Sequence, residues 1–394
     1  MIYLDNAGTT KTDDAVVQEM LPYFGEMYGN ASSLHSMGQR AKEILEQARE
    51  SVAKSINARP NEIIFTSGGS ESDNQAIISA CKIGEKRGKK HIITSKFEHH
   101  AVLHTLDKMK AQGFEVTYLD VYENGIVRVE DLKNAIRDDT CLVTIMFANN
   151  EIGTIQPIAE IGAICREKKI IFHTDAVQAV GHIPVDVQAQ NIDLLSISGH
   201  KFHGPKGVGV LYAKQGILLT PLINGGAQER NKRAGTENLA GIVGLAVALK
   251  NAVAEMAEVS ARETKLRDKL IQNLLKIPHS ALNGDAKNRL PNNVNICFEG
   301  IEGESLLLLL DDKGICASSG SACTSGSLDP SHVLLAIGRP HEVAHGSLRL
   351  TLSKFTTEQE IDEVIKVVPQ IVEYLRKISP VWDELQKGVR KYVI

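Results

Sequence analysis

The chain has 394 residues, 43% of them hydrophobic, which is enough for a large buried core divided between two lobes. A formal net charge of -4 gives no electrostatic reason to expect nucleic-acid binding. The first residues lack the basic and apolar regions of a signal peptide, and no apolar run approaches the roughly 18 residues of a membrane span. The six cysteines lack disulfide-like spacing, so we expect a cytoplasmic protein without membrane contact.

Short apolar segments alternate with amphipathic segments from about residue 60 to residue 215. This alternation predicts a mostly parallel β-sheet whose two faces are covered by helices. In such a sheet, polar residues that directly follow a strand lie at the edge where ligands bind.

The first such edge follows the strand predicted for Ile63–Thr66. A turn over Ser67–Ser72 leads into a helix that we expect to begin at Asp73, and its N-terminus offers free backbone N–H groups to an anion. Gly69 and Ser70 could cradle one phosphate group there. Neither Gly-Lys-Ser/Thr nor Gly-x-Gly-x-x-Gly occurs at this place, so a P-loop or a dinucleotide site is not supported.

Asp175 follows an apolar segment, Lys169–Thr174, that we predict as a second strand. A buried aspartate needs a cationic or hydrogen-bonding partner. The ring nitrogen of pyridoxal phosphate is such a partner in enzymes that use this cofactor. A capping aspartate is the alternative interpretation.

Lys201 ends the sequence Ser198-Gly199-His200-Lys201, just after a strand predicted over Asp193–Ile197. A lysine shielded from water can lose its proton near neutral pH and attack carbonyl carbon, which is Schiff-base chemistry. A solvated loop lysine is the alternative. The combination with Asp175 favours pyridoxal 5'-phosphate as cofactor.

Beyond the sheet, helices over 239–254 and 256–277 are expected to lead into a second lobe, and Pro278 stops the second helix. In that lobe the pattern predicts strands at 293–298 and 348–352 and helices at 304–311 and 357–377.

Ala317–Ser327 is small, polar and poor in residues that could pack, so it is predicted to be a surface loop. Cys323 stands in its middle, where an exposed thiol can ionise and react. The remaining cysteines lie in apolar helical or strand patterns: Cys81, Cys141, Cys165, Cys297 and Cys316. No Cys-x-x-Cys pair suggests a zinc ribbon or a redox pair. Cys323 is therefore predicted to be a nucleophile.

His341–His345 matches the zinc-protease pattern His-Glu-x-x-His, which requires a helix to bring both histidines to one face. Pro340 and Gly346 flank it, so only about one and a half turns fit. No downstream third ligand is present, and we predict no zinc site.

These motifs, in this order, resemble the cysteine desulfurases of the NifS/IscS type, which are class V aminotransferase-like enzymes. The resemblance extends from Tyr3 to Pro380, and the serine-rich segment around Cys323 resembles the first of the family's two groups, whose cysteine loop is long and movable. It implies an α/β fold of the aspartate-aminotransferase type, fold type I, with a mostly parallel seven-stranded sheet in the large domain. The expected domains are a large cofactor-binding domain at 15–255 and a small α/β domain at 1–14 and 256–394, which carries the catalytic cysteine.

The resemblance also implies the roles of residues around the cofactor. His99 resembles the imidazole that stacks on the pyridoxal ring and takes part in proton transfer. Gln178 resembles the hydrogen-bond donor to the ring oxygen. Ser198 and His200 resemble the residues that hold the phosphate, and Thr236 resembles a residue that reaches the partner's phosphate across a homodimer interface.

Two further residues resemble the substrate-binding pair of the family. Asn150 corresponds to an asparagine near the substrate carboxylate, and Arg349 to the arginine that grips it. A planar guanidinium suits that bidentate contact better than a lysine. The chain departs from the family at Gly8, where relatives more often have alanine, in a loop on the substrate side.

The implied activity is conversion of L-cysteine to L-alanine, with sulfur passing to Cys323 as a persulfide. The acceptor would be a protein of iron–sulfur cluster assembly, tRNA thiolation or a nitrogenase system. A selenocysteine lyase or another fold type I enzyme is the alternative. A non-catalytic platform is disfavoured because Lys201, Asp175, Arg349 and Cys323 are all present.

Overall fold

The computed structural model describes residues 1–319 and 330–394. Its central feature is a seven-stranded sheet in the order β2-β8-β7-β6-β5-β3-β4. The strands are β2 (Ile63–Thr66), β3 (His91–Ser95), β4 (Glu115–Leu119), β5 (Thr140–Thr144), β6 (Ile171–Asp175), β7 (Leu194–Ser198) and β8 (Gly209–Ala213). β8 alone runs in the opposite direction to the other six strands of this sheet, which confirms the predicted mostly parallel arrangement.

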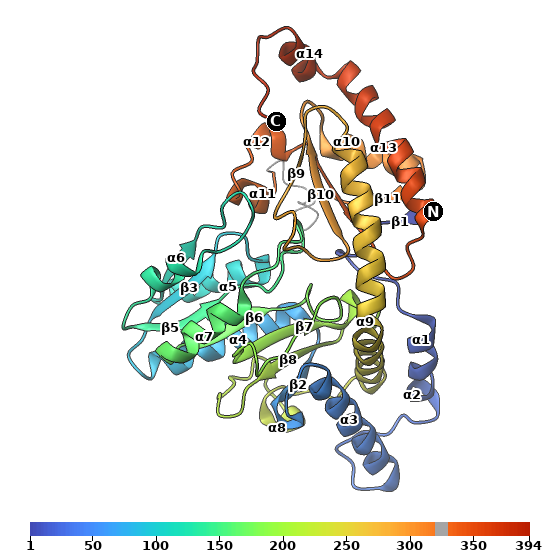
Figure 1. Ribbon diagram of the computed structural model, residues 1–394. Helices are drawn as coiled ribbons and strands as arrows, with labels where there is room; N and C mark the ends of the chain where they lie inside the picture. Colours follow the sequence, from blue (N-terminus) through green and yellow to red (C-terminus); the bar gives the residue numbers. More distant parts are fainter. Residues whose placement is uncertain (320–329) are drawn as a thin grey trace.

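Both faces of this sheet are buried, because successive strand residues point to opposite sides. Leu194 belongs to the buried cluster under α4 (Gly69–Glu85) and α5 (His100–Ala111). Its neighbour Leu195 belongs to the cluster on the other face, with α3 (Ser36–Ser55), α7 (Ile158–Lys168) and the start of α9. Figure 1 shows these helices around the sheet, with α6 (Val129–Ala135) near its β4 edge.

A single helix, α9 (Leu239–Leu274), replaces the two helices expected over this region. The predicted break at residue 255 is absent because alanine, glutamate and methionine there all favour helix. Leu245 and Leu249 pack in the core of the sheet region, whereas Leu266 and Leu270 belong to a different cluster. The helix thus connects the two parts of the molecule (Figure 1).

By length and composition alone, α9 could cross a membrane, since one 18-residue window has a mean hydropathy of 1.5. Half of that window is buried inside the protein. A buried core helix passes the same compositional test, so this single helix is weak evidence for a membrane span.

The second part of the molecule contains a three-stranded antiparallel sheet, β12-β10-β9, and a two-stranded parallel pair, β1-β11. The strands are β1 (Ile2–Tyr3), β9 (Ser280–Leu282), β10 (Asn293–Phe298), β11 (Ile315–Cys316) and β12 (Ser347–Thr351). Its helices are α10 (Gly303–Asp312), α11 (His332–Ala336), α12 (His341–Ala344), α13 (Glu358–Ile378) and α14 (Pro380–Gln386). The two predicted strands and two predicted helices are confirmed to within one residue at each end.

The N-terminal residues pack with this second part, since Leu4 joins its hydrophobic cluster. Asp5 forms a parallel bridge with Thr351 of β12. The chain then passes through α1 (Asp14–Met20) and α2 (Pro22–Gly25) into the sheet region. The domain boundaries at residues 14 and 255 remain predictions.

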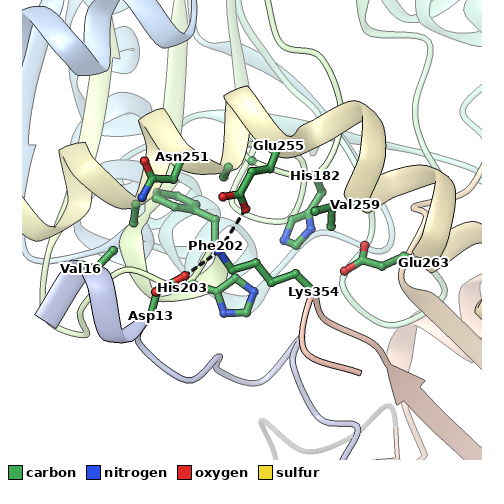
Figure 2. A pocket seen from close by; sticks show the side chains of 13 residues that line it. Asp13, Val16, His182, Phe202, His203, Asn251, Glu255, Val259, Glu263 and Lys354 are labelled. Carbon is green, nitrogen blue, oxygen red and sulfur yellow. Dashed lines mark hydrogen bonds and ion pairs between the residues drawn. The ribbon is translucent and has the colours of Figure 1, made fainter. Parts of the chain in front are cut away.

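A small cavity of ≈ 30 Å³ lies beside α9 where these two parts meet, as Figure 2 shows. Lys354 forms ion pairs with Asp13 at 2.5 Å and with Glu255 at 3.1 Å and so joins three chain segments. Glu263 faces the same cavity, is 2% exposed, and its Oε2 atom has no hydrogen-bond partner among the described residues. Burial raises the pKa of Glu263 to about 8, although nearby Arg262 acts in the opposite direction.

Replacing Glu263 with glutamine is expected to flatten the pH dependence of stability. The folded protein retains the Glu263 proton up to about pH 8, whereas the unfolded chain releases it near 4.5, so stability falls as the pH rises between these values. Between these pH values the free energy of unfolding of the wild type should fall by about 2–4 kcal/mol, whereas that of the variant should not fall by this amount. Urea unfolding at several pH values measures it. Glu258→Gln, on the exposed side of α9, is the control, and equal pH profiles for E263Q and wild type would contradict the prediction.

Candidate active site

Lys201 lies at the carboxyl edge of the sheet, three residues beyond β7 in a short 3-10 turn over Gly199–Lys201. Every residue of β7 is buried, as the sequence predicted. The Lys201 Nζ atom donates hydrogen bonds to the carbonyl oxygens of Ala7 at 2.6 Å and Gly8 at 2.7 Å. The amine is therefore directed back toward the N-terminal segment and held at a defined place.

Asp175 ends β6, the strand adjacent to β7, so its carboxylate lies at the same edge of the sheet as Lys201. It is 6% exposed, and its Oδ1 atom accepts a hydrogen bond from the backbone N–H of Val177 at 2.9 Å. Burial raises the pKa of Asp175, and the charges of His99 and Lys201 oppose that effect. Such a carboxylate is poised to balance a positive charge supplied from outside the chain.

His99 is the N-cap of α5, and its Nδ1 atom accepts a hydrogen bond from the Ala101 N–H at 3.1 Å. Burial lowers the pKa of His99, while the charge of Asp175 raises it and that of Lys201 lowers it. In the neutral ring the proton therefore belongs on Nε2, because Nδ1 is the acceptor. Electrostatic coupling of His99 to Asp175 and Lys201 agrees with the predicted grouping of these three residues.

The predicted phosphate turn lies at the N-terminus of α4, which begins at Gly69 and not at Asp73. The earlier start arises because Glu71 accepts a hydrogen bond from the Ser67 N–H at 2.8 Å and stabilises the first turn. Gly69 and Ser70 thus contribute the first helical N–H groups. A Cβ added at Gly68 would have only the Ser198 Oγ atom within 4 Å among the described residues, at 3.8 Å, so space is open beside this turn.

His200 and Gln178 both contact the N-terminal segment. The His200 Nδ1 atom is 3.0 Å from the Thr9 Oγ1 atom, and burial, reinforced by nearby Lys201, lowers the pKa of His200 to about 4. Gln178 donates a hydrogen bond from Nε2 to the Ala7 carbonyl oxygen at 3.1 Å. The structure thus places both predicted cofactor residues beside Lys201.

Arg349 and Asn150, the predicted substrate-binding pair, lie together. Arg349 is in β12 and 3% exposed, and its Nη1 atom donates to the Asn150 carbonyl oxygen at 3.3 Å. Its Nη2 atom forms an ion pair with the Asp5 Oδ1 atom at 2.8 Å. The adjacent Asn149 is buried and accepts N–H groups of its own loop, so it is structural.

The N-terminal turn Asp5–Gly8 is the part of the site that sequence reasoning left unassigned. Its carbonyl groups hold Lys201 and Gln178, and its aspartate holds Arg349. The only signal in the sequence was a run of small residues in a loop expected on the substrate side. Hydrogen bonds that side chains donate to backbone carbonyls depend on where the chain passes and not on residue type at the acceptor, so they could not be predicted.

Two buried carboxyl groups next to predicted site residues were also missed. Glu98, beside His99, accepts the Met146 N–H at 2.9 Å, and burial raises its pKa to about 8. Glu151, beside Asn150, is hydrogen-bonded by the Ser331 hydroxyl, and burial raises its pKa to about 7.

Cys323 lies outside the described residues, so its position in a surface loop stays a prediction. The flanking residues are nevertheless held at the site. Ser318 exchanges backbone hydrogen bonds with Arg349, at 3.2 and 2.6 Å. The Ser331 hydroxyl donates a hydrogen bond to the Glu151 carboxylate. The His332 Nε2 atom contacts the Glu98 carbonyl oxygen at 3.0 Å. Chain segments on both sides of Cys323 therefore contact the substrate-binding region.

The other five cysteines occupy the helices and strands predicted for them, and none forms a disulfide. Four are buried, and burial raises the pKa of the thiols of Cys81, Cys141, Cys165 and Cys297, in Cys141 and Cys297 to about 11. Such thiols stay protonated at neutral pH and are poor nucleophiles.

Two other sequence features lie away from this group. Thr236 is exposed in the loop before α9 and has no side-chain hydrogen bond to the site residues within the described chain.

In the His-Glu-x-x-His segment, α12 has only four residues, and the rings of His341 and His345 are 4.6 Å apart. Within residues 1–319 and 330–394, no group of three or more His, Cys, Asp or Glu side chains is arranged to hold a metal ion.

The described residues fit pyridoxal phosphate by their chemistry. Asp175 is a buried carboxylate that a cationic ring nitrogen would stabilise. The start of α4 and Ser198 surround open space with N–H and hydroxyl donors, which suits a phosphate group. Lys201 supplies an amine at the same sheet edge.

Comparison with known proteins agrees with this geometry. The aminotransferase class-V family matches residues 2–364. A protein named cysteine desulfurase IscS from Methanosarcina thermophila is 58% identical over 379 residues, which is 96% of this chain and 94% of the relative. A second, from Clostridium botulinum, is 57% identical over 390 residues, 98% of each chain.

Solved structures give the same result. A NifS-like protein superimposes with a TM-score of 0.89 at 41% identity, covering 95% of this chain and all of the other. A structure described as SspA in complex with cysteine has a TM-score of 0.80 at 37% identity, over 91% of this chain and all of the other. Both family and fold are therefore shared along nearly the whole length, and the chain belongs to the cysteine desulfurases of the aminotransferase class-V family.

Proposed function

We propose that this protein uses pyridoxal 5'-phosphate to convert L-cysteine into L-alanine and transfers the sulfur to Cys323 as a persulfide. The main support is that Lys201 and Arg349 both contact one N-terminal turn and that Asp175 interacts electrostatically with Lys201, in a chain of the cysteine desulfurase family. The related SspA structure contains cysteine, which agrees with this substrate.

The site offers a partner for each part of the cofactor. Asp175 would balance the positive charge of the ring nitrogen, Gln178 would donate a hydrogen bond to the ring oxygen, and His99 would lie beside the ring.

The phosphate would be bound by N–H and side-chain groups of Gly69, Ser70, Ser198 and His200, together with Thr236 of the partner subunit. When bound, pyridoxal phosphate supplies a carbonyl group for the substrate amine and a ring that accepts electrons from the α-carbon.

The chain's own residues bind the substrate and move its protons. Arg349 and Asn150 would hold the carboxylate of L-cysteine, because the guanidinium is buried and fixed by neighbouring groups. Lys201 would remove the α-proton through Nζ, which the Ala7 and Gly8 carbonyl groups hold in place. His99, uncharged because burial lowers its pKa, would exchange a proton through Nε2.

The sulfur step needs no external oxidant. The Cys323 thiolate forms a bond to the substrate sulfur, and the bond between that sulfur and the β-carbon breaks. The electron pair of the broken bond stays on the β-carbon, which takes up a proton. One L-cysteine thus gives one L-alanine and one persulfide on Cys323.

A second protein thiol would then take the sulfur, in the cytoplasm, for iron–sulfur cluster assembly or another thiolation pathway. The relatives named IscS support such a role. In the test tube a small thiol such as dithiothreitol can replace this acceptor and release the sulfur as sulfide.

The test is release of alanine and sulfide from L-cysteine by the cofactor-loaded protein under anaerobic, reducing conditions. Equal amounts of the two products are expected. A yellow, cofactor-loaded protein that forms neither product would refute the assigned reaction while leaving the fold assignment intact.

The protein is further proposed to act as a homodimer. Large apolar side chains are exposed on the single chain near its N-terminus, including Phe24, Tyr28 and Leu34, which is 93% exposed. Exposed apolar groups of this size are typical of surfaces that another chain covers. Thr236 is also exposed, as a residue serving the partner's site would be.

Sedimentation is expected to give twice the 42.9 kDa mass of one chain. Phe24→Asp should shift the protein toward the monomer, since a charge would be buried at the interface. Leu308→Asp, an exposed apolar residue of α10, is the control for a charge placed elsewhere. A monomeric wild type would contradict the proposal.

A further inference from the structure

Arg349 has one N–H group without a partner in the part of the chain that the structure describes. Its Nη1 atom donates to Asn150 and its Nη2 atom to Asp5, but its Nε atom is buried with no acceptor among residues 1–319 and 330–394. Buried N–H groups without acceptors are rare in folded proteins. The Nε and Nη2 N–H groups form a fork that matches a carboxylate. A ligand carboxylate is therefore expected on this edge, in contact with the same Nη2 atom that Asp5 holds.

Asp5 is fixed in its position by its surroundings. Its backbone is bridged to Thr351, two residues beyond Arg349 on β12. Its carboxylate lies under Gly8, where an added Cβ would be 2.7 Å from Oδ2. The Arg349 side chain is 4% exposed and that of Asp5 is 28% exposed, so the pair is only partly screened by water.

Resting on the function proposed above, we infer that Asp5 is a positioning residue that competes with ligand carboxylates for Arg349. It holds the guanidinium ready for a substrate, and its negative charge weakens the binding of any carboxylate that arrives. L-Cysteine and L-alanine carry the same carboxylate, so the weakening applies to both equally. Its benefit is faster release of the product, which keeps that group throughout the reaction.

Asp5→Asn tests this role because asparagine retains an oxygen that can accept from Nη2 while the charge is lost. The probes are L-alanine and L-alanine methyl ester, titrated into the cofactor-loaded protein by calorimetry. The dissociation constant for L-alanine is expected to fall about tenfold in the variant, whereas that for the ester, which lacks the carboxylate, should not fall. L-Alanine should also inhibit turnover at about a tenfold lower concentration.

Two further variants complete the experiment. Asp14→Asn removes a negative charge from the same segment at an exposed site and should leave the binding of L-alanine unchanged. Gly8→Ala would displace the Asp5 carboxylate without removing it, and should tighten L-alanine binding by a smaller factor, about threefold. It provides an independent test if D5N does not fold, which urea unfolding would reveal.

The outcomes separate this inference from the proposed function. If wild type prefers L-alanine to the ester and neither variant strengthens that preference, Asp5 does not compete and the inference alone is wrong. If D5N, in which no carboxylate competes for Arg349, binds L-alanine and the ester equally, Arg349 does not hold the ligand carboxylate, and both assignments are wrong.

Discussion

Cys323→Ser is expected to abolish the release of alanine and sulfide from L-cysteine, by about 10³-fold or more. A serine hydroxyl does not ionise at neutral pH and cannot accept sulfur as a persulfide. The binding of L-cysteine should persist, because Lys201, Arg349 and Asn150 are unaffected. The assay measures both products under anaerobic conditions, and the absorbance change of the bound cofactor on adding L-cysteine reports binding.

The matched control is Cys316→Ser. Cys316 lies seven residues earlier in the sequence, in β11, and is partly buried. This variant should retain its activity, since the Cys316 thiol has no part in the proposed reaction. If C323S released both products at the wild-type rate, Cys323 would not be the sulfur acceptor, whatever the substrate.

Lys201→Ala should eliminate turnover to a similar extent, about 10³-fold or more, and should also change how the cofactor is held. The structure places a single amine, Nζ of Lys201, against the Ala7 and Gly8 carbonyl groups at the sheet edge. Without it, the group proposed to remove the α-proton is lost. Borohydride treatment of the wild type should attach the cofactor irreversibly to the peptide containing Lys201, and treatment of the variant should attach none.

Lys206→Ala is the control for this experiment, because Lys206 is exposed five residues further along the same loop. It should retain the activity and the borohydride-stable label. Labelling of another lysine in the wild type would contradict the assignment of Lys201 even if K201A were inactive.

The residue types and their places at strand ends could be determined from the sequence alone. Strand β2 begins and ends at the predicted residues, and Asp175 and Lys201 lie at or just beyond the ends of two strands as expected; the structure shows that these strands are adjacent. These predictions succeeded because a strand that is buried on both faces is a nearly continuous run of apolar residues. Polar side chains follow only where the strand reaches the edge of the sheet. The family resemblance, which the comparisons confirm, then assigned the cofactor and the reaction.

Helix boundaries were less predictable for local reasons. α9 runs unbroken through residue 255 because charged residues of high helix propensity do not end a helix. α4 begins at Gly69 because a hydrogen bond from Ser67 to Glu71 caps it. No proline marks either boundary, and the N-cap of α4 is a glycine, Gly68, which has no side chain that could cap the helix.

Only the tertiary structure decided which distant groups meet. The contacts of Lys201 with Ala7 and Gly8, and of Arg349 with Asp5, join residues nearly 200 and more than 300 positions apart. Sequence patterns report periodicity and local chemistry, and they carry no information on where a backbone carbonyl passes. The sequence therefore determined which chemical groups the site contains, whereas the packing of the N-terminal turn against β7 and β12 determined how they are held.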